Sequence, residues 1–295
     1  MAARRERFTQ SILQPFDNDV TFGDKDLVAE APDLDRRTQY RLEAESSRRR
    51  KITLLRLAIV AAITAYAALL RDASAAGPLL GAGIKAMPVL LMVTLVLILA
   101  EGHGSYTHRV ASGLAASAVG DILLDLVDTP WLSGMDGFLG GLCAFLAAHV
   151  CYISAFSCNE LKPTLLTVGP AVGCVVGIFL VLQPGLGPGL AAPVLAYSIA
   201  IGLMLVAALS RNPEGYASLW SWRCGAVGAS VFALSDAILG YNRFVAPVTH
   251  AKWLIMGTYW LAQYLIAMST RGAQKRPITK ALGSVENFSM RHKLK

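Results

Sequence analysis

The sequence predicts an all-α membrane protein, with about eight transmembrane helices in one bundle. The chain is 54% hydrophobic and only 16% charged, whereas soluble domains carry charge on about a quarter of their residues. The charges are also segregated, because residues 1–51 and 271–295 hold most of them. The stretch between these ends is a series of long apolar runs. Such a distribution is typical of a chain whose middle lies in lipid.

Eight apolar runs are long enough to cross about 30 Å of hydrocarbon as helices. They are residues 52–70, 79–99, 108–127, 137–157, 164–182, 191–209, 222–240 and 252–270. The loops between them are short and contain turn residues such as Gly77-Pro78 and Asn212-Pro213. Short loops make neighbouring helices antiparallel, which predicts a single transmembrane domain.

Both ends of the chain are predicted to lie outside the bundle, in the cytosol. Residues 1–51 are polar and are expected to form a disordered extension. Residues 52–270 are expected to form the eight-helix transmembrane domain, and residues 271–295 a basic tail. Basic residues flank the first and last spans, and the number of spans is even, so both termini face the cytosol. Residues 291–295 resemble a dibasic signal for return to the endoplasmic reticulum, with arginine in place of the second lysine, which predicts that location.

Composition also limits the partners and cofactors. The net charge is +7, but the basic residues gather in the tails, where anionic lipid headgroups explain them better than nucleic acid does. The cysteines form no C-x-x-C pair and lie in or beside apolar runs, so they are expected to pack as small hydrophobic residues. They are Cys143, Cys151, Cys158, Cys174 and Cys224. We therefore expect no disulfide framework.

The fifth predicted span carries a stripe of small residues, Gly169-x3-Gly173-x3-Gly177. In lipid, such a stripe lets another helix approach closely. We expect it to pack within the bundle, and a homodimer seam is the alternative.

The two halves of the chain show a short similarity. The third span contains SAVGDILL (117–124) and the seventh contains FALSDAIL (232–239), which aligns Asp121 with Asp236 four helices apart. This favours two four-helix repeats in parallel orientation with a site between the halves. Chance similarity between apolar sequences is the alternative.

Four ionisable residues lie deep in the predicted spans, where an ionised side chain is costly: Lys85, Asp121, His149 and Asp236. For His149 alone, a hydrogen-bonded helix contact is the favoured interpretation. Two buried aspartates favour a functional site, because unpaired buried charges would strongly destabilise the bundle. Tyr152 shares a helix face with His149, and Gln263 adds a polar group to the eighth span.

Competing catalytic motifs are absent from the sequence. It contains neither H-E-x-x-H nor G-x-S-x-G. Only His149 lies within a span, so no multi-histidine metal site can form there. We therefore expect no metal and no cofactor, and metal-free acid–base chemistry is the simplest enzymatic hypothesis.

Five segments in family order resemble the YhhN family, including its animal lysoplasmalogenase branch. They are IKAMPVL (84–90), SAVGDILL (117–124), GLCAFLAAHVCYISAF (141–156), FALSDAILGYNRF (232–244) and IMGTYWLAQ (255–263). The resemblance implies hydrolysis of the vinyl ether of a lysoplasmalogen to a fatty aldehyde and a glycerophospho-alcohol, with lysophospholipid and bilayer lipid as partners. By position, it places the family's polar residues at Lys85, Asp121, His149, Tyr152, Ser235, Asp236, Asn242 and Gln263. The long N-terminal tail departs from the family pattern.

The aspartates suit this reaction. A vinyl ether is hydrolysed by protonation of its β-carbon, followed by attack of water on the oxocarbenium ion. One carboxyl must then be protonated near neutral pH, while a second is ionised to stabilise the cation and activate water. The sequence leaves open which of Asp121 and Asp236 is the acid. Lys85 or His149 would bind the phosphate or adjust the ionisation of the pair.

Three other functions are alternatives to lipid hydrolysis. A transporter or channel could use the carboxylates as a proton relay. An intramembrane aspartyl protease also needs two aspartates, but its known forms pair Tyr-Asp with Gly-x-Gly-Asp, and the contexts here are Gly120-Asp121 and Ser235-Asp236. A scaffold has no need of buried carboxylates.

Overall fold

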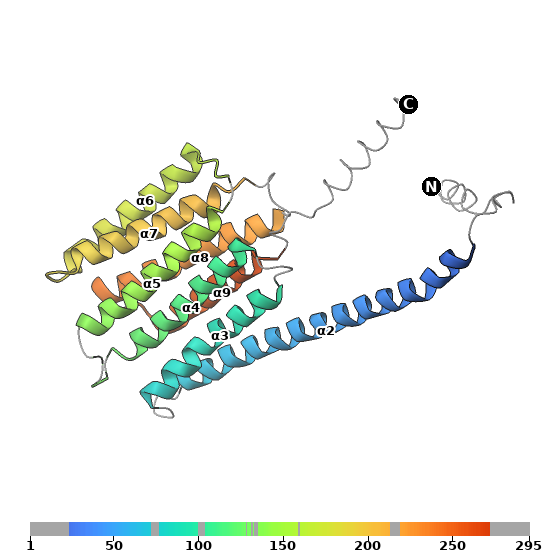
Figure 1. Ribbon diagram of the computed structural model, residues 1–295. Coiled ribbons are helices and arrows are strands. Elements are labelled where there is room, and N and C mark those ends of the chain that lie inside the picture. The colour runs from blue at the N-terminus through green and yellow to red at the C-terminus, as the bar shows by residue number, and fades with distance from the viewer. Residues whose placement is uncertain are drawn as a thin grey trace, which may run out of the picture. The chain divides into compact units, whose positions relative to one another are not determined.

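The computed structural model describes residues 24–71, 77–99, 104–127, 129–130, 132, 135–158, 160–212 and 219–271. Within these ranges the protein consists of eight α-helices and one 3-10 turn, with no β-strand, which confirms the predicted fold class (Figure 1). The chain divides into two compact units, residues 1–50 and residues 51–295.

The helices follow the predicted spans closely. They are α2 (Asp24–Arg71), α3 (Pro78–Leu99), α4 (Ser105–Asp125), α5 (Met135–Phe156), α6 (Leu165–Leu182), α7 (Ala191–Leu209), α8 (Leu219–Phe244) and α9 (Ala251–Met268), with the turn η1 (Gln183–Gly185) after α6. Proline occupies the first position of α3, where its missing N–H costs no hydrogen bond. At the start of α6, the Thr167 hydroxyl accepts a hydrogen bond from the Thr164 backbone N–H at 3.0 Å.

Residues 24–51 are helical, although the sequence predicted disorder across 1–51. The segment 40–51 is rich in arginine and glutamate, which favour helix. Glu45 and Arg49 lie one turn apart in it, with 3.9 Å between carboxylate and guanidinium. The remainder of the predicted extension, residues 1–23, lies outside the described residues. So does the tail from residue 272 onward.

Six helices of the second unit form a closed ring. Helix α3 packs on α4, α4 on α5, α5 on α7, α7 on α8, α8 on α9, and α9 returns to α3. Helix α6 packs outside this ring on α7 and α8, and α4 also contacts α9. In α2, Tyr66 makes an edge-to-face ring contact with Trp260 of α9, with ring centroids 5.4 Å apart. The interior of the ring is where polar side chains of several helices can meet.

Glycines allow α4 and α5 to approach closely. A Cβ added to Gly113 would lie 2.3 Å from the Tyr152 ring, and one added to Gly120 would lie 2.6 Å from the Phe145 ring. Both aromatic rings are buried. Small residues at helix contacts are the usual means of tight packing in lipid, because burial from water supplies no driving force there.

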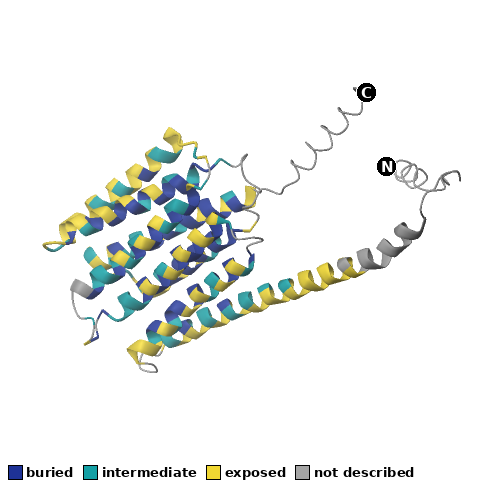
Figure 2. Cartoon of the chain, in the orientation of Figure 1, coloured by how far each residue is buried: buried dark blue, intermediate teal, exposed yellow. Residues whose placement is uncertain are grey.

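The outward faces of the helices are exposed, as Figure 2 shows in yellow, and many of the side chains on them are apolar. Exposed large apolar side chains occur on every helix, for example Leu57, Leu90, Val119, Val150, Val176, Leu203, Val227 and Leu261. Large exposed apolar surface is typical of contact with lipid. By length and composition, six of the described helices can cross a membrane, namely those built on α2, α3, α5, α6, α7 and α8. The protein is therefore an integral membrane protein.

Helices α4 and α9 are less apolar because they carry polar residues both inside the bundle and near their first turns. Asp121 lies in α4 and Gln263 in α9, and both side chains are buried. Arg109 of α4 and Lys252 of α9 are exposed. Contact of α4 with α3, α5 and α9 surrounds it with protein on several sides.

The glycine stripe of α6 does not pack within the described part of the bundle. A Cβ added to Gly169, Gly173 or Gly177 would meet no atom within 4 Å, and all three residues are exposed. The opposite face of α6 makes the contact with α7, where a Cβ on Gly202 would lie 2.5 Å from Val175. The expected intramolecular packing is thus wrong for these residues, and the homodimer remains a prediction.

Candidate active site

The two aspartates lie inside the ring, and each accepts a hydrogen bond from a tyrosine. Tyr259 of α9 donates to Asp121 Oδ2 at 2.6 Å. Tyr197 of α7 donates to Asp236 Oδ2 at 2.8 Å. The charge of Asp121 acts on Asp236 across the interior. The structure therefore places the predicted pair within electrostatic range and adds a phenol to each member.

His149 of α5 lies beside Asp236. Its Nδ1 is 2.6 Å from the Phe145 carbonyl oxygen, which can only accept, so Nδ1 carries a hydrogen. Its Nε2 is 3.7 Å from Asp236 Oδ2 and has no hydrogen-bond partner among the described residues. Nε2 is therefore the ring nitrogen that faces Asp236, and a small movement would let the pair share a proton.

Tyr152 and Gln263 form a second polar group in the interior. Tyr152 donates to Gln263 Oε1 at 2.7 Å, and its hydroxyl lies 3.5 Å from Ser117 Oγ. All three side chains are buried. Gln263 also lies within interaction range of the Tyr259 hydroxyl. This polar group therefore leads from α5 through α9 to Asp121.

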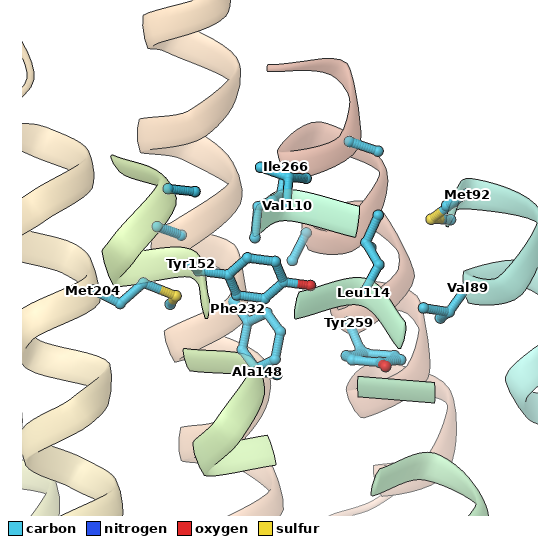
Figure 3. Packing of buried hydrophobic residues seen from close by; sticks show 14 of the residues in the cluster. Val89, Met92, Val110, Leu114, Ala148, Tyr152, Met204, Phe232, Tyr259 and Ile266 are labelled. Carbon is cyan, nitrogen blue, oxygen red and sulfur yellow. The ribbon is translucent and has the colours of Figure 1, made fainter. Parts of the chain in front are cut away.

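Aromatic rings pack beside these polar groups, and Figure 3 shows those of Tyr152, Phe232 and Tyr259 in the buried core. The Phe232 ring lies 4.9 Å from the His149 ring and 5.7 Å from the Tyr259 ring, centroid to centroid. The Phe145 ring lies 6.0 Å from that of Tyr259. Rings of this size exclude water, which strengthens electrostatic interactions between the groups they enclose.

Lys85 of α3 forms an ion pair with Asp125 of α4, with Nζ 2.9 Å from Oδ1. The Lys85 charge also reaches Asp121, one turn earlier in α4. The sequence analysis gave Lys85 two roles, phosphate binding or control of the aspartates. In the structure, the Lys85 ammonium group is paired with a carboxylate and is not free to bind another anion.

A cavity of about 330 Å³ adjoins Asp236. Asp236 and Tyr197 are on its wall, and Asp121 is not. Aliphatic side chains of α6, α7 and neighbouring helices line much of it, among them Leu142, Val175, Ile178, Leu182, Val194 and Ile201. Its polar lining residues include Lys85, Asp125, Asn242, Arg243 and Lys252. The cavity thus offers apolar walls, a carboxyl group and a basic region to one ligand.

Two of the predicted supporting residues make structural contacts. Ser235 donates to the Ile255 carbonyl at 3.0 Å, which ties α8 to α9. Asn242 Oδ1 accepts from the Val248 N–H at 2.9 Å, which fixes the loop between these helices. Asn242 also lines the cavity, whereas Ser235 does not.

The sequence analysis missed Tyr197, Tyr259, Asp125, Arg243 and Lys252 as site residues. Tyrosine is common in transmembrane spans and gave no signal by itself. For Tyr259, the spacing to Gln263, one turn away on α9, could have drawn attention to it.

In the described part of the chain, no three histidine, cysteine or acidic side chains are grouped as metal ligands. The five cysteines are free thiols. The expectation of a metal-free reaction remains a prediction.

The similarity to known proteins covers the same segment that forms the ring of helices. The model of the YhhN family matches residues 80–270. The chain belongs to the YhhN family. Among curated YhhN-like relatives, it is 35% identical to "Lysoplasmalogenase TMEM86B" of Sus scrofa over 66% of this chain and 77% of the relative. It is 35% identical to "Lysoplasmalogenase TMEM86B" of Homo sapiens over 67% of this chain and 76% of that protein.

A bacterial relative of this YhhN protein is more distant. "Lysoplasmalogenase" of Mycobacterium tuberculosis (strain CDC 1551 / Oshkosh) is 33% identical over 59% of this chain and 66% of its own length. No solved structure matches the fold. The family match begins at residue 80 and ends at residue 270, so it contains every site residue described above.

Proposed function

We propose that this protein is a lysoplasmalogenase that hydrolyses the vinyl ether of a lysophospholipid by acid–base catalysis with Asp236 and Asp121. The observation that carries the proposal is a carboxyl group, Asp236, on the wall of a largely aliphatic cavity with a second carboxyl group close by. The names of the relatives, all of which are called lysoplasmalogenases, supply the substrate class.

In this mechanism Asp236 is the acid. It is the aspartate that lines the cavity, and the imidazole of His149 beside it can share its proton. Asp236 delivers a proton to the β-carbon of the vinyl ether, and the α-carbon becomes an oxocarbenium ion. A low-dielectric site favours a neutral carboxyl group, which is the form that can donate.

Asp121 is the ionised partner. Tyr259 donates to it and the Lys85 ammonium lies within electrostatic reach, and both suit a carboxylate. Asp121 accepts a proton from the water that attacks the oxocarbenium carbon, which gives a hemiacetal. The hemiacetal hydroxyl returns a proton to Asp236, Asp121 protonates the glycerol oxygen, and the C–O bond breaks. One water is consumed, and a fatty aldehyde and a glycerophospho-alcohol are released.

The test is aldehyde release by the protein purified in detergent. Lysoplasmenylethanolamine is the substrate, and a lysophospholipid with an ester at the same position is the control. We expect aldehyde from the vinyl ether and no fatty acid from the ester. Detergent removes any membrane gradient, so turnover would exclude the proton-relay transporter, and the absence of aldehyde would refute the proposal.

A further inference from the structure

The cavity carries two cations for which the acid–base mechanism has no use. Arg243, near the end of α8, and Lys252, near the start of α9, both line it. Both side chains are exposed, so solvent and lipid headgroups reach them. They lie on either side of the loop that Asn242 fixes through its bond to Val248.

Within the described part of the chain, no acidic side chain pairs with these two cations. The Lys85 ammonium, which also lines the cavity, is paired with Asp125 at 2.9 Å. The ion pairs among the described residues include neither Arg243 nor Lys252. The Arg243 guanidinium instead lies 5.5 Å from the centre of the Phe138 ring, a contact that orients the cation and leaves its N–H groups for an anion. Among the side chains that the structure describes, the basic end of the cavity therefore has no carboxylate partner.

The distance between Arg243 and Asp236 matches the distance between the phosphate and the vinyl ether of a lysophospholipid. Arg243 follows Asp236 by seven residues on α8, two turns on the same face, which is a rise of about 10 Å. Helical side chains lean toward the helix N-terminus, so the long Arg243 side chain leans back toward Asp236. In a lysoplasmalogen, five bonds separate the ether oxygen from phosphorus, a reach of about 6 Å. A vinyl ether at Asp236 would therefore hold its phosphate within reach of Arg243.

We propose that Arg243 and Lys252 form the phosphate subsite of the enzyme and select phosphorylated vinyl ethers over neutral ones. The inference rests on the proposed function and extends it to the headgroup end of the substrate. The guanidinium binds two phosphate oxygens in a forked contact, and the ammonium adds a point charge from the other side of the loop. Lys85 is already paired with Asp125, so the phosphate is bound by Arg243 and Lys252.

The experiment compares two vinyl ethers that differ only in the headgroup, lysoplasmenylethanolamine and 1-O-alkenylglycerol. The measured quantity is the ratio of their kcat/KM values, for the full-length protein and for Arg243→Gln, Lys252→Gln and the double variant. We expect each single change to lower the preference for the phosphorylated substrate about tenfold, and the double change to lower it further. Arg223→Gln is the matched control, because Arg223 is an exposed arginine at the other end of the same helix.

A second measurement keeps the test independent of catalysis. The 1-O-alkyl lysophosphoethanolamine and 1-O-alkylglycerol carry no vinyl group, so their affinities report binding alone. The same variants should lose affinity for the phosphorylated ether and not for the neutral one. If wild-type protein released no aldehyde but kept this binding preference, the proposed reaction would fail while the phosphate subsite stood.

Three results would overturn the subsite. The first is an unchanged preference in both variants. The second is an equal loss on both substrates, which a structural role would produce. The third is loss of the wild-type preference when excess diacyl phospholipid is added, because the two cations would then bind bilayer headgroups in general.

Discussion

At the scale of single residues, the structure gives Asp121 and Asp236 different surroundings. Asp121 accepts a hydrogen bond from the Tyr259 hydroxyl and lies in the electric field of the Lys85 ammonium. Asp236 accepts a hydrogen bond from the Tyr197 hydroxyl and faces Nε2 of the His149 imidazole. A carboxyl pair divides acid and base roles only if its members differ in environment. Here the difference comes from one ammonium and one imidazole on separate helices.

The first prediction concerns the carboxyl groups. Asp121→Asn and Asp236→Asn should each lower kcat at least about a hundredfold, because an amide can neither give nor take the required proton. Aldehyde release by the purified variants measures this. Each variant should elute in detergent as the wild type does and should still bind the 1-O-alkyl lysophospholipid. Near-full activity in either variant would contradict the two-carboxylate mechanism.

The second prediction concerns the tyrosines. Tyr197→Phe and Tyr259→Phe remove one hydrogen bond to a carboxyl group and preserve the ring. Tyr259 bonds to the ionised Asp121, and Tyr197 bonds to the charge that Asp236 develops as it gives up its proton. Bonds to charged groups contribute about 1.5–3 kcal/mol, so we expect kcat to fall by about tenfold or more in each variant. Tyr264→Phe is the control, since Tyr264 lies on α9 but contacts neither aspartate. An unchanged kcat in both test variants would show that the phenols only pack.

Two residues show why part of the site escaped prediction. Asp121 and Asp236 were found because a carboxyl group in an apolar run is costly and needs a reason. Tyr197 was not found, because a tyrosine in a span costs little and is common. Only the contact between α7 and α8 gives it a partner, and that contact is a property of tertiary structure.

At the scale of helices, the positions of the spans followed from hydropathy alone, but the faces they bury did not. For α6, a stripe of glycines suggested the packed face. The packed face is instead the one that carries Val175, and the glycines are exposed. Small residues permit close approach without requiring it. Helix α6 lies outside the ring, so the arrangement of the ring helices decides which face of α6 is packed.

The third prediction tests this contrast between glycines. Gly113→Ala should destabilise the bundle by about 1–3 kcal/mol, because its Cβ would lie 2.3 Å from a buried ring with little room to move. Gly169→Ala is the matched control on the open face of α6, where alanine should be neutral or slightly stabilising, since it favours helix over glycine. Thermal unfolding in detergent compares the two.

The Gly113 prediction also has a functional side. The ring displaced by the new methyl group is that of Tyr152, whose hydroxyl donates to Gln263. Gly113→Ala should therefore lower activity along with stability. A variant that is as stable as wild type would contradict the packing argument, and an equal loss in Gly169→Ala would place α6 against a partner, such as a second copy of the chain.

At the scale of the whole transmembrane unit, the helix contacts repeat with a period of four helices. The contact of α3 with α4 corresponds to that of α7 with α8, α4 with α5 to α8 with α9, and α5 with α7 to α9 with α3. The repeat hypothesis drawn from SAVGDILL and FALSDAIL is consistent with this arrangement. The same 115 residues separate Asp121 from Asp236 and Gly113 from Gly228. Each glycine receives a large side chain from the next helix, Tyr152 and Ile266 respectively.

The repeat hypothesis also accounts for an asymmetric site. One residue beyond the aligned segments, Asp125 corresponds to Gly240, so the ion pair with Lys85 exists in one half only. The cavity adjoins Asp236, in the half without that pair. Two equivalent carboxyl groups would compete for the same role. In the proposed mechanism, divergence between the halves would give the two carboxyl groups different roles.

The side of the membrane on which the cavity lies follows from helix direction. Its basic residues come from the end of α8 and the start of α9, and its other polar residues include Lys85 early in α3 and Asp125 at the end of α4. The last helix ends at Met268, at the opposite end of α9 from Lys252. The cavity therefore lies toward the side of the bundle opposite to the end of α9 at Met268.

The last prediction concerns orientation and decides which leaflet supplies substrate. Basic residues flank the first and last spans, which places both termini in the cytosol for an even number of spans. The cavity then faces the lumenal side, and a single-chain lysolipid enters from that leaflet. Protease treatment of sealed microsomes should remove epitope tags from both tails, and the sequon Asn287-Phe288-Ser289 should stay unglycosylated. Detergent-opened microsomes are the control for tag access. A protected C-terminal tag, or glycan on Asn287, would reverse the orientation and place the phosphate subsite on the cytosolic face.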